Sequence, residues 1–317
     1  DAGAQDDLFP YTISYDTPDN ATNISRQLSR PAGGDGFVRA DGDRFVTDAG
    51  DFRIWGTNFC FEACFPEKED AEKVAARLAR FGINCVRMHH MDNYSIWGDS
   101  GNHIDIDPKK LDKLDYLIYQ LKENGIYTNL NLHVSRMFDM KDGDFPHSNE
   151  RPKYDKGLDN FEPRMIELQK KYAKDLLTHV NPYTGKPYTE EPAVSMVEIN
   201  NENALLIEWY RGSFDTLPEP YIGEFRSQWN AWLREKYGTT EALRKAWDVK
   251  SVPLGDSLLV PDPISQEALK NQWRLQMDSA AVASMSVADG AGPDGGNVLV
   301  VKVEKQGEQS WVPQLIY

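Results

Sequence analysis

A carboxylate flanked by amides follows an apolar run in the segment AVSMVEINNENAL, residues 193–205. The apolar run predicts a buried strand, so Asn201 and Glu202 come at its carboxyl end, where enzymes built on parallel sheets carry their chemistry. A carboxylic acid in a concave, partly dry site stays protonated to higher pH and can donate a proton to a leaving oxygen. Glu202 is therefore a candidate general acid. Its alternative roles are to cap the next helix or to pair with a cation.

Arg87 and two histidines end an earlier segment, NCVRMHH, residues 84–90. A buried arginine usually binds a carboxylate through two parallel hydrogen bonds, which orients that carboxylate and keeps it ionised. Arg87 could thus support a nucleophilic carboxylate, or it could form a structural ion pair. His89 and His90 raise the question of a metal, but neighbouring residues of a strand face opposite ways. We expect at least one of them to hydrogen-bond in or beside a cleft.

His133 ends a third segment, IYTNLNLHV, and is either a site residue or a satisfied core histidine. Aromatic rings after strands are candidates for stacking on a ligand, because such loops line the active-site face. Among these rings we favour Trp97 and Trp209. Weaker candidates for the same face are Tyr94, Phe138 and Tyr210, with Asp92 and Arg136 as contacts to ligand hydroxyls.

Charge and composition exclude several classes of protein. The 317 residues include 35 Lys and Arg against 50 Asp and Glu, a net charge of −15, which argues against a nucleic-acid partner. No run approaches the roughly 18 apolar residues of a membrane helix. The polar start, DAGAQDDLFP, leads us to expect a secreted protein whose signal has been removed, although an arbitrary starting point would look the same.

Three cysteines, Cys60, Cys64 and Cys85, are too few for a disulfide framework. We expect buried thiols, with a bridge between Cys60 and Cys64 as the alternative. No histidine pair stands at zinc-binding spacing from them, so the sequence predicts neither a metal nor another cofactor.

Four strand and helix pairs organise the middle of the chain. Residues 1–34 predict an arm and residues 36–53 a β-hairpin that caps one end of the main domain. The predicted pairs are 53–59 with 67–81, 84–90 with 108–125, 126–134 with 164–180, and 193–203 with 221–237 followed by a short helix at 240–247. Such a repeat requires a parallel sheet, either open or closed as a barrel.

Side-chain alternation favours the barrel. Asn129, Asn131 and His133 share one face of their strand, and Arg87 shares a face with His89. An open sheet with helices on both sides would be apolar on both faces. One face here becomes polar toward the carboxyl end, which is typical of a barrel mouth. By the same alternation Glu198 lies deeper than Glu202, as an interior hydrogen-bonding partner, and the strand must bend for both Asn201 and Glu202 to reach one ligand.

The composition changes after the fourth unit. Residues 251–263 resemble a linker, 264–277 predict a last helix, and the remaining residues predict antiparallel strands around a glycine-rich turn at 289–296. About 40 residues are too few for a β-sandwich of roughly 100. Four barrel strands would also leave two apolar edges open, so we expect the chain to be part of a longer protein.

The motifs WGTNF, VRMHHMD, NLNLHV and VEINNENAL together resemble the retaining β-glycanases of clan A. The resemblance is closest to the cellulase-like glycoside hydrolases of family 5, which have a (β/α)8 TIM barrel, and it covers residues 45–247. It implies that Glu202 is the acid/base catalyst and that Asn201 contacts the sugar 2-hydroxyl. It further implies that Arg87 helps to form the environment of the nucleophile and that His133 lines the subsite nearest the scissile bond.

The family's nucleophile is a glutamate after the seventh barrel strand, whereas only four strands are predicted here. The late residues Glu267, Glu304 and Glu308 do not end such a strand, so we expect the nucleophile outside this sequence. The predicted domains are an arm and hairpin (1–44), the N-terminal half of a barrel (45–277) and the start of a β-sandwich (jelly-roll) carbohydrate-binding module (278–317).

The expected function is a retaining glycoside hydrolase that cleaves a β-linked polysaccharide of the β-glucan or mannan type. Its expected partners are that polysaccharide and the missing half of the same protein, with no nucleic acid and no membrane. A non-catalytic carbohydrate-binding protein on the same barrel is the main alternative. A metal-dependent barrel hydrolase is a third.

Overall fold

A computed structural model describes residues 13–247, 274–288, 298–308 and 313–316 of the chain. The chain divides into two compact units, Asp1–Ile222 and Gly223–Tyr317. No helix among the described residues is both long enough and apolar enough to cross a membrane.

The first unit is built around a four-stranded parallel sheet with the order β4-β5-β6-β9. Three strands fall inside the segments that the sequence predicts, and β4 extends one residue past its segment. The four are β4 (Gly56–Cys60), β5 (Cys85–His89), β6 (Tyr127–Asn131) and β9 (Val194–Glu198). The register places Arg87 beside Asn129 and Asn131 beside Glu198. The four predicted βα units are therefore confirmed. The described sheet keeps two edges, so the closed barrel stays a prediction.

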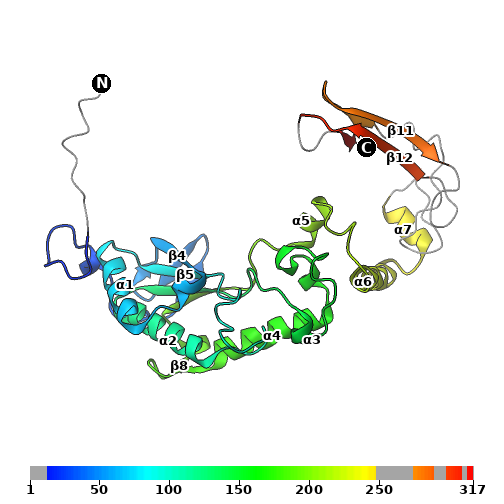
Figure 1. Cartoon of the computed structure of the whole chain (residues 1–317). Coiled ribbons are helices and arrows are strands. Elements are labelled where there is room, and N and C mark those ends of the chain that lie inside the picture. The colour runs from blue at the N-terminus through cyan, green and yellow to red at the C-terminus, as the bar shows by residue number, and fades with distance from the viewer. Residues whose placement is uncertain (1–12, 248–273, 289–297, 309–312, 317) are drawn as a thin grey trace, which may run out of the picture. The chain divides into compact units, whose positions relative to one another are not determined.

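Three helices lie along one side of this sheet (Figure 1). They are α1 (Lys68–Arg80), α2 (Pro108–Glu123) and α4 (Pro163–Thr178). The side chain of Asp107 accepts hydrogen bonds from the backbone N–H groups of Lys109 and Lys110, and with Pro108 it begins α2 as the sequence predicts. The helices therefore start where local capping chemistry places them.

Small and branched side chains fill the space between helices and sheet. Ala71, Ala75 and Ala79 on α1 are fully buried, and their small size lets α1 approach its neighbours closely. The buried residues of α2 are Leu114, Leu117, Ile118 and Leu121. These stripes join the buried strand residues in one core. The buried positions of both helices recur with the 3.6-residue period of an amphipathic helix.

The two faces of the sheet differ in polarity. Val86, Met88 and Leu130 point into the core under the helices and are fully buried. Arg87 and Asn129, at alternate positions, point to the opposite face. The predicted alternation is confirmed, and one face of the sheet is left for polar chemistry.

An antiparallel meander closes the amino end of the strands. It consists of β1 (Arg39–Asp41), β2 (Arg44–Thr47) and β3 (Gly50–Asp51), one short strand more than the predicted hairpin. The Phe52 ring meets Tyr127 edge-on with 4.7 Å between centroids. Ala32 from the arm is buried with Cys85 and Tyr127 at the starts of β5 and β6. The predicted capping role is confirmed, and the carboxyl ends of the strands form the opposite edge.

Shorter elements connect these parts of the first unit. They are η1 (Ser25–Gln27), η2 (Phe61–Cys64), α3 (Met140–Gly143), η3 (Lys153–Asp155), η4 (Leu158–Asn160), the β7 (Val180–Asn181) and β8 (Lys186–Pro187) hairpin, η5 (Tyr188–Glu190) and α5 (Leu205–Tyr210). All three cysteines carry free thiols, so the alternative of a Cys60–Cys64 bridge is not realised.

The second unit contains most of α6 (Tyr221–Tyr237), then α7 (Thr240–Ala246) and four strands. The strands are β10 (Arg274–Gln276), β11 (Val282–Ala288), β12 (Val298–Lys305) and β13 (Gln314–Ile316), paired antiparallel as β11 with β12 and β10 with β13. The predicted helix at 264–277 is wrong at β10, and its earlier part lies outside the described residues. So do the predicted linker and the glycine-rich turn. The antiparallel strands are confirmed, whereas a β-sandwich stays a prediction.

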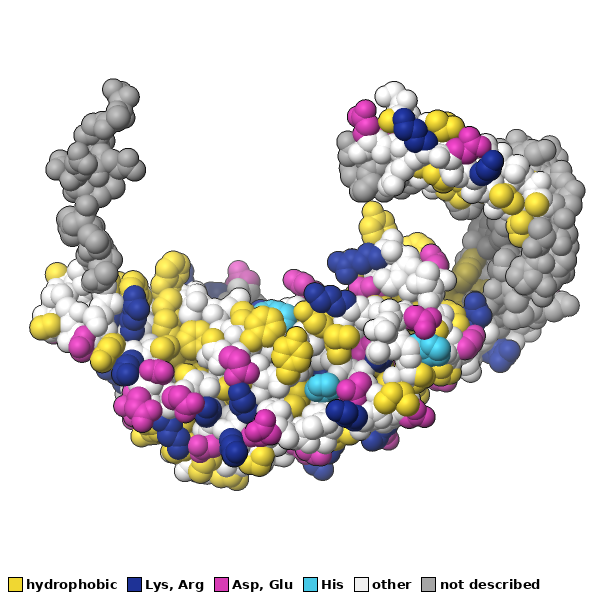
Figure 2. Space-filling model, viewed as in Figure 1, with side chains coloured by type: hydrophobic (Ala, Val, Ile, Leu, Met, Phe, Trp, Pro, Cys, Tyr) yellow, Lys and Arg dark blue, Asp and Glu magenta, His cyan; other side chains and the backbone are white. Residues whose placement is uncertain are grey.

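Acidic and basic side chains alternate over α1 and α2 on the face shown in Figure 2. Lys68 pairs with Asp112 at 3.1 Å, and Lys110 pairs with Glu62 at 2.6 Å. Exposed pairs of this kind contribute little stability. This surface is a solvated helical layer.

We expect Leu114→Ala to lower the free energy of unfolding by about 2–5 kcal/mol, because it empties a fully buried site under the sheet. Urea denaturation would measure the change. Leu206→Ala is a matched control: its side chain is 70% exposed, and we expect a change within about 0.5 kcal/mol. Equal effects of the two substitutions would contradict this assignment of the core.

Candidate active site at the carboxyl edge of the sheet

An ion pair between Arg87 and Glu198 lies at the centre of the polar face. Nε and Nη2 of Arg87 each donate to one carboxylate oxygen of Glu198, both at 2.6 Å. Asn129 and Asn131, on the strand between them, donate amide hydrogens to the same two oxygens at 2.6 and 2.8 Å. The Arg87 hydrogen bond is the main cause that holds the pKa of Glu198 below its usual value, against the opposing effect of burial. Glu198 is the interior hydrogen-bonding partner that the sequence predicts.

The chain bends after β9 and brings Asn201 back to this face. Its backbone N–H donates to the carbonyl of His133 at 2.9 Å, and its side-chain oxygen accepts from Nη2 of Arg87 at 2.9 Å. Glu202 then takes a left-handed backbone conformation, with φ +47°. Left-handed backbone is uncommon for residues other than glycine. The predicted bend is present, and it places Asn201 and Glu202 together at the strand end.

Glu202 stands beside Arg87 and His90. Its negative charge adds to the hydrogen bond and charge of Glu198 in raising the pKa of Arg87. It also opposes burial, which is the main cause of a lowered pKa at His90. The side chain of Glu202 is exposed, so the drying that we expected around it is not present within the described residues.

The two adjacent histidines make separate contacts at the same edge. Nδ1 of His89 lies 3.4 Å from the amide nitrogen of Asn131, whereas Nδ1 of His90 lies 2.8 Å from the Ser135 hydroxyl. The His90 ring stacks on Phe61 with 4.5 Å between centroids. Burial is the main cause that lowers the pKa of both histidines, which favours neutral rings at neutral pH. Hydrogen bonding beside the site is thus confirmed for both.

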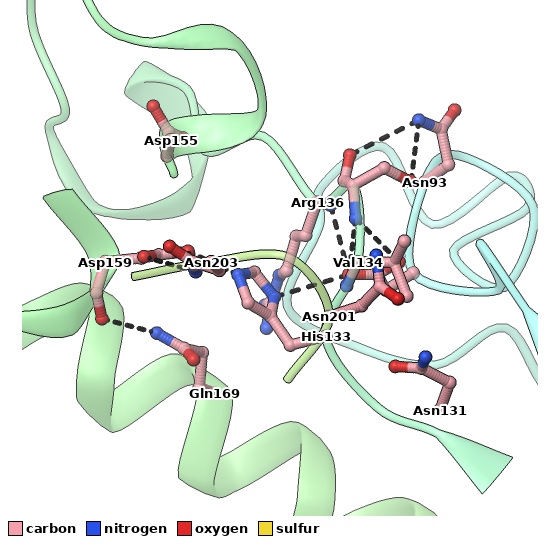
Figure 3. Close-up of polar contacts among 12 residues, drawn as sticks. Asn93, Asn131, His133, Val134, Arg136, Asp155, Asp159, Gln169, Asn201 and Asn203 are labelled. Carbon is pink, nitrogen blue, oxygen red and sulfur yellow. Dashed lines mark hydrogen bonds and ion pairs between the residues drawn. The ribbon is translucent and has the colours of Figure 1, made fainter. Parts of the chain in front are cut away.

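His133 lies below this surface between two carboxylates (Figure 3). It is 4% exposed, its Nε2 contacts Asp159, and its Nδ1 lies 3.3 Å from Asp92. Burial opposes its protonation, but the hydrogen bonds and charges of Asp159 and Asp92 outweigh burial and raise its pKa to about 9. His133 is therefore a buried imidazolium. It contacts the strand-end loop from beneath, and a direct contact with sugar stays a prediction.

Several residues that we expected on the surface are buried instead. Trp97 is 1% exposed and donates its indole N–H to the carbonyl of Asp92 at 3.0 Å. The Arg136 guanidinium packs 4.5 Å from the ring centroids of both Trp97 and Phe138, and both residues are 1% exposed. The Asp92 carboxylate accepts backbone N–H groups from three successive residues, beginning at Val134. These four side chains are therefore not exposed to a ligand within the described residues, and their predicted ligand contacts gain no support.

Three other aromatic rings remain available to a ligand. Trp209 is 64% exposed, Tyr210 82% and Tyr94 74%. Trp209 and Tyr210 lie on α5, directly after the Glu202 loop. Exposed rings close to a strand end are suited to stacking on sugar faces, so Trp209 keeps the role that the sequence predicts for it as a prediction.

The sequence reasoning missed Asp159, Asn203 and Lys156. The Asn203 side chain donates to both oxygens of Asp159, and Lys156 donates to the carbonyls of Asn201 and Glu202. Asp159 and Lys156 belong to the long connection between β6 and α4, which shows no periodicity. Only the Asn-Asn-Glu-Asn sequence itself pointed toward Asn203.

One group within the described parts of the chain has the geometry of a metal site: His103, Asp139 and Asp142, whose ligand atoms lie within 4.8 Å of one another. Both oxygens of Asp142 already accept hydrogen bonds from His103, from its backbone N–H at 2.6 Å and its ring Nδ1 at 2.9 Å. Asp139 forms a capping box with Asp142 at the start of α3. These hydrogen bonds explain why the three residues lie together: they connect the loop that holds His103 to the start of α3.

We expect His133→Gln to destabilise the protein mainly at low and neutral pH. The histidine pKa rises from 6.5 to about 9 on folding, so the stability it contributes is fully present below pH 6.5 and is lost as the pH rises through 9. At about 1.4 kcal/mol per pKa unit, the pH-dependent part amounts to roughly 3 kcal/mol. Urea denaturation of both proteins between pH 5.5 and about 9.5 tests this. A difference between wild type and variant that does not change with pH would contradict a buried imidazolium.

Comparison with known proteins agrees with the motifs at this edge. The cellulase family, glycosyl hydrolase family 5, matches residues 42–243. Mannan endo-1,4-beta-mannosidase 1 of Oryza sativa subsp. japonica is 27% identical over 184 residues, which are 54% of this chain and 41% of that protein. The chain thus spans about two fifths of the curated relative it matches.

Two solved structures are also similar. The endo-1,4-beta-mannanase from Rhizomucor miehei aligns with a TM-score of 0.42 and 19% identity, over 67% of this chain and 58% of that one. The endo-beta-1,4-mannanase from Thermotoga petrophila aligns with a TM-score of 0.38 and 24% identity, over 54% and 40%. The family match itself covers more than half of the chain and includes the whole parallel sheet with Arg87, Glu198 and Glu202. This chain belongs to glycosyl hydrolase family 5.

Proposed function

We propose that the protein hydrolyses β-glycosidic bonds in a polysaccharide by double displacement, with Glu202 as the acid/base catalyst. The observation that carries the proposal is the turn at Asn201 and Glu202, which brings an exposed carboxylate to the polar face of the sheet beside Arg87. Family membership supports the same assignment.

Glu202 would act twice in this reaction. As an acid it donates a proton to the glycosidic oxygen while a second carboxylate attacks the anomeric carbon. As a carboxylate it then takes a proton from the water that releases the sugar, and the configuration is retained. Retaining enzymes keep the two carboxyl groups about 5–5.5 Å apart.

We infer that the second carboxylate comes from outside residues 1–317, in the other half of the same protein. Arg87 supports this inference, because Nε and Nη2 are engaged by Glu198 and Asn201 while Nη1 donates to no acceptor in the described ranges. Nη1 can therefore hold a further carboxylate and keep it ionised. Glu198 is less suited to attack, since its oxygens already accept from Arg87, Asn129 and Asn131.

A β-1,4-mannan is the substrate we favour, and a β-glucan is the alternative. The relative from Oryza sativa is named as an endo-1,4-beta-mannosidase, which supports mannan. Trp209 and Tyr210 offer exposed rings for stacking on such a chain. A polymer of this kind is met outside the cell, in agreement with our expectation of secretion. We also propose that the strands from residue 278 onward begin a carbohydrate-binding module.

We expect Glu202→Gln to lower kcat/KM on β-mannan by about 10²–10⁴-fold, because the amide cannot donate or accept the catalytic proton. The substitution is made in the full-length protein that the host organism produces. Reducing-sugar release from mannan and from β-glucan, measured side by side, tests the role and the substrate together. The matched control is Glu123→Gln at the far end of α2, which should leave turnover unchanged.

Full turnover by Glu202→Gln would refute the acid/base assignment. Binding of mannan by the wild type without any hydrolysis would instead favour the non-catalytic carbohydrate-binding alternative. Greater activity on β-glucan would overturn only the choice of polymer.

Chelation should leave activity unchanged, since this mechanism uses two carboxylates and water. Turnover is measured after dialysis against EDTA and again after Mg²⁺, Ca²⁺ or Zn²⁺ is restored. A loss on dialysis that a metal reverses would support the metal-dependent alternative.

A further inference from the structure

Asn203, which follows Glu202, has every polar group of its side chain engaged. Its oxygen accepts from the backbone N–H of Gly157 at 2.7 Å and from the Asn160 amide at 2.9 Å. Its nitrogen donates to the two oxygens of Asp159 at 2.8 and 2.9 Å. The side chain therefore ties the turn after β9 to the connection between β6 and α4.

Asp159 is in turn held from the interior. Its carboxylate is fully buried and contacts Nε2 of His133, and its carbonyl accepts from the Gln169 side chain at 2.8 Å. Figure 3 shows Asp159, Asn203 and His133 next to one another, with Asn201 beside them. Because His133 is also fastened to Asp92, this anchor is tied to the loop after β5 as well.

The residues before Glu202 are fixed by separate contacts. Asn201 is bound through its N–H to the His133 carbonyl and through its side chain to Arg87. Lys156 donates to the carbonyls of Asn201 and Glu202 at 3.2 and 3.1 Å. The side chain of Glu202 is exposed and its backbone is left-handed, so its position depends on its neighbours.

We propose that Asn203 and Asp159 are positioning residues that hold the Glu202 carboxylate in line with the scissile bond. This inference rests on the proposed function, because it assumes that Glu202 transfers the catalytic proton. Neither residue touches the reacting atoms. Their effect reaches them through the backbone on the carboxyl side of Glu202.

The physical reason is alignment. A proton donor that is displaced by about 1 Å can lose on the order of 100-fold in rate, since transfer needs a well-directed hydrogen bond. An exposed turn without anchors samples several backbone states, and fixing a residue in one of them costs conformational entropy. The short side chain of Asn203 is hydrogen-bonded at both its oxygen and its nitrogen. It therefore removes that freedom at the residue next to the donor.

Aryl β-mannobiosides with different leaving groups test the proposal, with the matching cellobiosides used if glucan is the better polymer. A phenyl leaving group needs protonation, whereas 2,4-dinitrophenolate leaves without it. We expect Asn203→Ala to lower kcat/KM on the order of 100-fold for the phenyl glycoside and to change it little for the dinitrophenyl glycoside. Glu202→Gln should show the same selectivity.

Asn181→Ala is the matched control. Asn181 is a fully buried amide of the first unit, whereas Asn203 is partly buried, and its side chain is likewise hydrogen-bonded at both ends, to the Asp115 carbonyl and the Tyr183 N–H. A general loss of folded protein lowers both rates together, so this control should leave the ratio of the two substrates unchanged. Equal losses on both substrates in Asn203→Ala, or no loss, would overturn the proposal.

An exchange of Asp159 and Asn203 tests whether the lost rate can be restored. Asp159→Asn alone should lower the phenyl rate, whereas Asp159→Asn combined with Asn203→Asp restores a carboxylate and an amide facing each other. The carboxylate at 203 can still accept from Gly157 and Asn160, and the amide oxygen at 159 can still accept from His133. We expect the double variant to recover most of the phenyl rate, and failure to exceed the single variants would contradict the positioning role of Asn203 and Asp159.

Amide hydrogen exchange separates this inference from the proposed function. Peptides that span residues 199–208 should exchange faster in Asn203→Ala than in the wild type and should not change in Asn181→Ala. Unchanged exchange in Asn203→Ala overturns the positioning role of Asn203 even if Glu202 is catalytic. Faster exchange in a protein that cleaves no glycoside would show that the turn is held in this way while the proposed function fails.

Discussion

The ion pair of Arg87 with Glu198 decides where the site can form. It crosses the sheet from β5 to β9, and the amides of Asn129 and Asn131 on the intervening strand complete its hydrogen bonds. An arginine and a glutamate in a half-buried position are costly unless both are satisfied. Only the observed register brings all four groups together. The pair also holds Arg87 where its guanidinium donates a hydrogen bond to the side chain of Asn201. This contact directs the chain that leaves β9.

The same alternation of side chains builds the core and the site. Val86, Met88 and Leu130 bury one face under helices, which supplies the apolar area that stabilises the unit. The residues between them point away and carry the polar groups. Because the strands are parallel, their carboxyl ends meet at one edge, and the loops after β5, β6 and β9 converge there.

Buried charge links those three loops. The His133 imidazolium contacts Asp159 on one side and Asp92 on the other, and Asp92 also receives backbone N–H groups from the loop after β6. Each charge is satisfied by the others, so the group can be buried without a large penalty.

Local patterns in the sequence determined the four βα units, the inner faces of α1 and α2, and the shared face of Arg87, Asn129 and Asn131. Each of these depends on periodicity or capping within a few residues, which the chain carries along its length. Only the tertiary structure decided the burial of Trp97, the pairing of His133 with Asp159 and the strand β10. Trp97 and Trp209 look alike in sequence, since both follow a strand. Their fates differ because Arg136 and Tyr172, distant along the chain, pack against Trp97. Contacts between distant segments are set by how elements pack together, and no local pattern encodes them.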